Sequence, residues 1–176
     1  MMFFALLGGI ALAAWGLSRI GVPGLRTWPA RMRPALAIAL LLAGIDHLVS
    51  PGRYLPMIEA FVPWPAAVVA ATGLCEIAGA IGLLLPATRR AAAILLAVYF
   101  VCVFPANVAN AVNGLAVDGL PQAAWYYWLR LAFQPLVIWW ALRAGAVIGP
   151  WPLPERRPSP ERQARPAGLH SPGGTR

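Results

Sequence analysis

The sequence predicts an all-α integral membrane protein, folded as one helical bundle. Of its 176 residues, 60% are hydrophobic and only 11% are charged, whereas a soluble domain carries about 25% charged residues. The apolar residues gather in long runs, and a run of ~20 residues is enough to cross the ~30 Å hydrocarbon core of a bilayer. The length suits one bundle of four or five helices better than two domains.

Five apolar segments are expected to form this bundle within residues 1–148. They are Met2–Ser18, Pro34–Ser50, Pro65–Leu85, Ala91–Val112 and Ala123–Gly145. The first could instead be a signal peptide, but it lacks a positive leading region and Arg19 follows it, which favours a retained helix. Tyr54–Val62 lies among prolines and is too short to cross, which predicts an interfacial or re-entrant piece. Residues 149–176 are rich in Pro, Arg, Ser and Gly and are expected to be a disordered tail.

The net charge of +8 comes from fourteen arginines and no lysine. Their placement argues for membrane orientation and against a nucleic-acid partner. If the loop after the first segment is cytoplasmic, twelve arginines lie inside, Arg53 lies outside and Arg130 lies within a segment. This bias predicts five spans in the cell inner membrane with the N-terminus out and the C-terminal tail in the cytoplasm.

Glu76 lies near the middle of the third apolar segment. A carboxylate at that depth is costly, so it should face the protein interior and have a partner. Arg130 is the basic residue buried in a comparable segment, which predicts an ion pair between Glu76 and Arg130. The alternative is that this pair only holds helices together, because polar contacts between membrane helices contribute on average ~0.6 kcal/mol.

The other polar groups of the segments fall in the outer half of the predicted bundle, which predicts a polar pocket open to the extracytoplasmic side with Glu76 as its floor. The candidate pocket residues are His47, Glu76, Asn107, Asn110, Tyr126, Arg130 and Gln134. For the histidine and the asparagines the alternative is structural: a hydrogen bond to a loop carbonyl, and amides that pack helices.

Small residues and prolines are expected to shape this pocket. Ala71, Cys75 and Gly79 form a small-x-x-x-small row, which lets a neighbouring helix approach closely in lipid. Prolines in the fourth and fifth segments free the carbonyls of Val101 and Leu131 from helical hydrogen bonds, and these carbonyls are expected to line the same cavity.

Four motifs occur in order: AGIDHLVSP, TGLCEIAGAIGLLLPATRRAA, FPANVANAV and WLRLAFQPLVIWWAL. Together they resemble the DoxX-like family of small multi-pass bacterial membrane proteins, over about residues 35–142. The resemblance implies a four-helix core, to which the first segment adds an extra N-terminal transmembrane helix. It also implies an accessory role, since the family takes its name from a subunit associated with thiosulfate:quinone oxidoreductase.

The expected function is therefore that of a multi-pass inner-membrane accessory protein, a subunit or assembly factor of a quinone- or sulfur-linked redox system. The sequence has no paired redox cysteines, no metal-ligand spacing and no flavin fingerprint, so no cofactor is evident and the protein is not expected to have an activity of its own. Quinone is the candidate ligand. The expected partners are the lipid bilayer and either another membrane protein or a second copy. The alternatives are a small-solute transporter and a membrane chaperone with a polar outer-half pocket.

Overall fold

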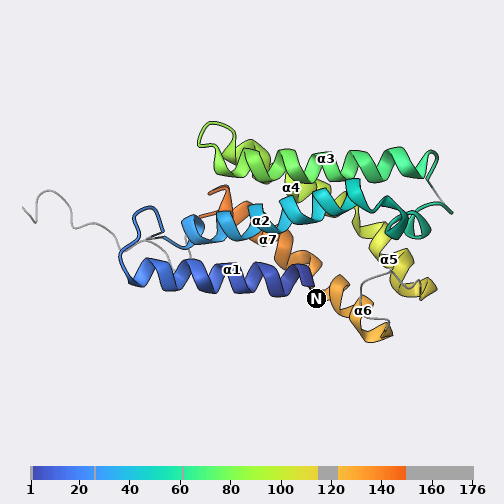
Figure 1. Cartoon of the computed structure of the whole chain (residues 1–176), viewed down its shortest axis with the longest axis horizontal. Helices are drawn as coiled ribbons and strands as arrows, with labels where there is room; N and C mark the ends of the chain where they lie inside the picture. The colour runs from blue at the N-terminus through green and yellow to red at the C-terminus, as the bar shows by residue number, and fades with distance from the viewer. Residues whose placement is uncertain (1, 26, 61, 115–122, 150–176) are drawn as a thin grey trace, which may run out of the picture.

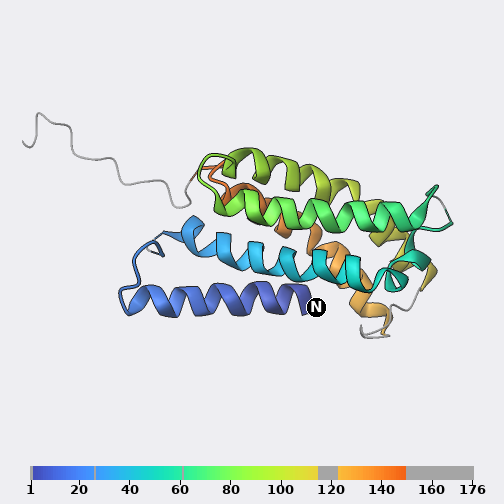
Figure 2. The same ribbon diagram turned by 45° about the horizontal axis from the view of Figure 1, so that its top comes forward.

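The computed structural model describes residues 2–25, 27–60, 62–114 and 123–149. Every regular element in these ranges is helical, which confirms the predicted fold class at the level of an all-α protein. Helices α1, α2 and α3 run beside one another along the long axis, whereas α5 and α6 are inclined to it (Figures 1 and 2). The tail that was predicted to be disordered falls, from residue 150 on, outside the described residues.

The first two helices form a hairpin. Helix α1 spans Met2–Arg19 and α2 spans Trp28–Val49. The predicted start of the second segment at Pro34 is wrong, because the helix begins at Trp28. A proline stands in its first turn, where the missing N–H has no helical partner anyway, and Pro34 is accommodated inside the helix.

Helix α3 spans Pro65–Leu84, as predicted. Its buried positions recur every three or four residues and form one stripe along the helix. They are Val69, Gly73, Glu76, Ala80 and Leu83. The small-residue row predicted as the contact face is wrong in part, because Ala71 and Cys75 are exposed.

The actual close approach between α2 and α3 joins Gly44 and Gly73. A Cβ atom on Gly73 would lie 2.8 Å from the carbonyl oxygen of Gly44, and a Cβ on Gly44 would lie 2.6 Å from the carbonyl oxygen of Gly73. The two backbones therefore touch, which only residues without a side chain allow. This contact brings the polar side chains one turn away on both helices within reach of each other.

The fourth and fifth apolar segments are each broken into two helices. Helices α4 (Arg89–Cys102) and α5 (Phe104–Asn113) meet at Val103, and α6 (Ala124–Ala132) and α7 (Gln134–Ala144) meet at Phe133. In both cases a proline stands in the first turn of the second helix, as expected from its missing N–H. Each break lets the chain bend without leaving the bundle.

The short segment between α2 and α3 forms two turns of 3-10 helix, η1 (Pro51–Arg53) and η2 (Leu55–Met57). They sit at the end of the bundle opposite the α3–α4 turn (Figure 2). The buried core of the other half joins α1, α2, α3, α4 and α7 through small and aliphatic side chains, among them Leu36, Leu40 and Leu83.

Three helical stretches of the described chain are long and apolar enough to cross a membrane: Trp28–Val49, Pro65–Leu84 and Arg89–Asn113. They indicate a membrane protein. The end of α1 and the starts of α2 and α4 carry arginines and gather at one end of the bundle, where α7 also ends (Figure 2). There the Nε of Arg33 donates a hydrogen bond to the Ala144 carbonyl oxygen over 2.8 Å.

Candidate functional site

A cavity of about 390 Å³, here called the central cavity, opens between the helices near the breaks. Its wall includes side chains from α1, the α2–α3 connection and all later helices. Most of the lining is apolar, with Phe3, Phe4, Met57, Val69, Phe100, Val103 and Val137 among the contributors. Five of the seven candidate residues also line it: His47, Glu76, Asn107, Arg130 and Gln134.

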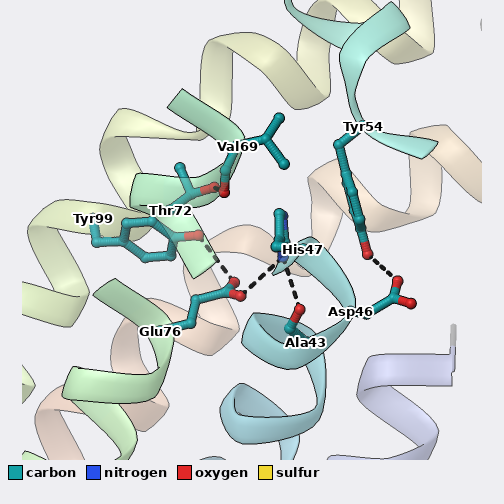
Figure 3. Close-up of polar contacts among 8 residues, drawn as sticks. All are labelled: Ala43, Asp46, His47, Tyr54, Val69, Thr72, Glu76 and Tyr99. Atoms are coloured by element: carbon teal, nitrogen blue, oxygen red, sulfur yellow. Dashed lines mark hydrogen bonds and ion pairs between the residues drawn. The ribbon is translucent and has the colours of Figure 1, made fainter. Parts of the chain in front are cut away.

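Glu76 is almost completely buried, with 7% of its surface exposed. Tyr99, on α4, donates a hydrogen bond from its hydroxyl to the Oε1 atom of Glu76 over 2.9 Å. Figure 3 shows Glu76 reaching from α3 toward both Tyr99 and His47, so the carboxylate lies between three helices. The role of Tyr99 was missed from the sequence, where it is a lone hydroxyl in an apolar run.

His47, on α2, is the second partner of this carboxylate. Its Nδ1 atom lies 3.1 Å from Oε2 of Glu76 and 2.8 Å from the Ala43 carbonyl oxygen (Figure 3). A carbonyl oxygen only accepts, so Nδ1 must carry a proton. Oε2 nevertheless has no well-aligned hydrogen-bond donor among the described residues. The proton on Nδ1 therefore points at Ala43, and the contact with Glu76 is a close electrostatic one.

The predicted ion pair between Glu76 and Arg130 is wrong. Arg130 lies on α6 and donates from Nη2 to the Oδ1 atom of Asn107 over 3.3 Å, while its guanidinium carbon lies 6.0 Å from the centre of the Tyr126 ring. The backbone contact between α2 and α3 places His47 beside Glu76 instead. Matching opposite charges along the sequence could not reveal that approach.

Two of the candidate residues are buried but do not contribute to the central cavity. Asn110 is 1% exposed and Tyr126 is 2% exposed, and neither is part of the lining. Gln134 opens α7 and uses its amide N–H₂ to donate to the Phe100 carbonyl oxygen over 2.7 Å. It thereby joins the two broken helix pairs.

A polar network at the end of α2 adjoins the cavity, and its member Tyr54 lines the cavity. Asp46 accepts a hydrogen bond from Nη1 of Arg53 over 2.8 Å and another from the hydroxyl of Tyr54 over 2.5 Å. The Tyr54 ring stacks on the His47 ring, with centroids 3.9 Å apart. Burial, and then the neighbouring Asp46 carboxylate, raise the pKa of the Tyr54 phenol above its ordinary value. In the sequence, this network is indicated only by Asp46 near the end of the second apolar segment and by Arg53 and Tyr54 just after it.

A second hollow of about 430 Å³ is apolar and is lined by residues of α4, α5, α6 and α7. Val101 and Leu131 contribute to this groove and not to the central cavity, so their expected place in the polar pocket is wrong. Val101 is exposed, whereas Leu131 is half-buried and packs against the cluster that contains Tyr126 and Tyr127. Among the described residues, no three His, Cys, Asp or Glu side chains are grouped so that they could hold a metal ion.

Apolar helices of membrane-spanning length, packed around a cavity that a buried carboxylate lines, indicate a helical membrane protein with an internal cavity. Residues 36–145, more than half of the chain, match the family described as "Domain of unknown function (DUF8561)", and the protein belongs to that family. The match starts within α2 and leaves α1 outside. No curated protein and no solved structure matches the chain.

Proposed function

We propose that the protein is a multi-pass inner-membrane accessory protein of the DoxX-like type, which holds a small amphipathic molecule in its central cavity. The proposed ligands have an apolar body and oxygen atoms that accept hydrogen bonds, a class that includes quinones and sulfur-containing small molecules. In this role the protein is a subunit or assembly factor of a redox system and works with a membrane partner or a second copy. The N-terminus lies outside and the C-terminus in the cytoplasm.

The central cavity is the observation that supports this proposal. Its volume of about 390 Å³ lies within the ~300–1,000 Å³ range of small-molecule sites, which are mostly apolar with a few polar groups that orient the ligand. Here the orienting groups are the Arg130 guanidinium, the Asn107 amide that it contacts and the Glu76–His47 pair, all of which line the cavity. Such a site binds a ligand through its apolar body and orients it through its oxygens.

A cavity-filling substitution tests the proposal. Val103 lines the cavity at the α4–α5 break, whereas Val98, on α4, does not line it and has 54% of its surface exposed. Decylubiquinone should bind to the purified wild-type protein in lipid nanodiscs and to Val98→Phe, but at least about tenfold more weakly to Val103→Phe, since a phenyl ring would occupy ligand volume. Native mass spectrometry of protein extracted in mild detergent should also show a retained small molecule. Equal binding to both variants would contradict a role for this cavity.

A small-solute transporter is the second candidate function. Two broken helix pairs and a buried ionisable pair, His47 and Glu76, are features of membrane transport sites. Reconstituted vesicles with a trapped pH dye would show a proton flux that Glu76→Gln abolishes. Vesicles as tight as protein-free controls would exclude proton-coupled transport by the protein alone.

A further inference from the structure

Arg130 is the guanidinium that lines the central cavity, and it has no acidic partner among the described residues. Its recorded contacts are the hydrogen bond to the Asn107 carbonyl oxygen at 3.3 Å and the face of the Tyr126 ring. A guanidinium has five N–H groups, so most of its donors remain available.

The carboxylates described elsewhere in the chain do not neutralise it. Asp46 pairs with Arg53 at 2.8 Å, Glu76 lies 3.1 Å from His47, and Glu59 is exposed. Arg130 is half-buried and borders apolar walls, where an opposite charge stabilises a cation more than it would in water. No described carboxylate supplies that charge, so an anion that enters the cavity can supply it.

We propose that the Arg130 end of the central cavity is a subsite for the anionic head group of the ligand. The head group is a carboxylate, sulfonate or phosphate, whose oxygens accept two parallel N–H bonds from the guanidinium. Asn107 supplies a further donor: because its Oδ1 accepts from Arg130, its amide N–H₂ is the side of the group left to bind another acceptor.

The apolar part of the cavity lining determines what the ligand carries besides its head group. Phe100, Val103 and Val137 belong to the apolar wall of the same cavity, so the head group must be attached to an apolar body. This inference rests on the proposed ligand-binding function and narrows it, because anionic amphiphiles are favoured over neutral quinones. A lipid phosphate and the acid group of a free amphiphile offer the same chemistry, and the experiment below separates them.

Decanoate and its neutral counterpart 1-decanol are the probes. They differ in charge at the head group and share the ten-carbon chain. Binding to the full chain is measured at neutral pH in nanodiscs that contain only phosphatidylcholine, with the wild type, Arg130→Gln, Arg130→Lys and Arg90→Gln. Arg90 is an exposed arginine outside the cavity and controls for the loss of one positive charge.

Decanoate should bind to the wild type and to Arg90→Gln, and about ten- to hundredfold more weakly to Arg130→Gln, because hydrogen bonds between charged groups are lost. The decanoate affinity of Arg130→Lys should lie between those of the wild type and Arg130→Gln, since lysine keeps the charge and loses the bidentate geometry. 1-Decanol should bind equally to all four, which shows that the cavity itself is intact. If Arg130→Gln does not fold, the decanoate affinity of Arg130→Lys is compared with that of Arg90→Gln, and a weaker affinity of Arg130→Lys supports the subsite.

Decanoate affinity that is unchanged by both Arg130 substitutions, or absent from the wild type, overturns the subsite. Retained 1-decanol or decylubiquinone binding would then leave the proposed function standing. In nanodiscs with added phosphatidylglycerol, competition that weakens decanoate binding to the wild type but not to Arg130→Gln supports the subsite and identifies a lipid head group as a natural occupant. No such competition supports the subsite with a free organic anion as its ligand.

Discussion

Replacing Gly73 by alanine tests how α2 and α3 position the buried carboxylate. The new Cβ atom would lie 2.8 Å from the Gly44 carbonyl oxygen and 2.9 Å from Cβ of His47. Carbon atoms normally pack at ~3.5–4.0 Å, so the two helices must separate by roughly 0.5–1 Å. One of the clashing atoms belongs to the backbone, which cannot rotate away as a flexible side chain can.

The magnitude follows from two opposing terms. Overpacking a close contact costs ~1–3 kcal/mol, and alanine favours a helix interior over glycine by up to ~1 kcal/mol. Gly73→Ala should therefore lower the free energy of unfolding by up to about 2 kcal/mol, and by about 1–3 kcal/mol relative to a glycine-to-alanine change that meets no other atom. It should also lengthen the 3.1 Å contact between His47 and Glu76, because the added methyl group pushes directly on the histidine.

Unfolding of the purified protein in mixed micelles, titrated with a denaturing detergent, measures this change. Gly9→Ala on α1 is the matched control, since its Cβ would meet no atom within 4 Å; it should be neutral or more stable by up to ~1 kcal/mol. The loss of stability in Gly79→Ala should lie between those of the other two variants, because its Cβ would meet side-chain atoms of Leu96 alone, the nearest being Cδ2 at 2.5 Å, and no backbone atom. A Gly73→Ala protein as stable as Gly9→Ala would refute the backbone contact.

Three further substitutions probe the contacts around the cavity. Tyr99→Phe removes the donor to Glu76 and leaves a buried acceptor unpaired, so the same unfolding assay should show a loss of about 1–3 kcal/mol. The Tyr54 phenol has a raised pKa in the folded state, so its contribution to stability is present below the ordinary pKa of 10.0 and is lost as the pH rises above that value. Tyr54→Phe also removes the hydrogen bond to Asp46, and it should make the dependence of the unfolding free energy on pH flatter above pH 10.0. Arg33→Gln removes the hydrogen bond to the end of α7 and should cost about 1 kcal/mol, with no change if that contact does not form in solution.

The helical class and most of the helix positions follow from the order of the amino acids alone. Apolar runs of membrane-spanning length set α2, α3 and the α4–α5 stretch, because the hydrophobic pattern and its length are properties of the chain alone. The burial of Glu76 could also be predicted, since a carboxylate within such a run has no other stable place. Prolines correctly indicated the breaks near Val103 and Phe133.

Which polar groups meet depends on how the helices pack against one another. Glu76 is paired with His47 and Tyr99 because the glycine contact sets the approach and rotation of α2 against α3, and no periodicity along one helix carries that information. The same packing leaves Arg130 at the cavity wall without a carboxylate partner among the described residues. Charge complementarity in the sequence shows which partners are available, whereas the distance between helix axes, set by the smallest side chains at the contact, selects the pair that forms.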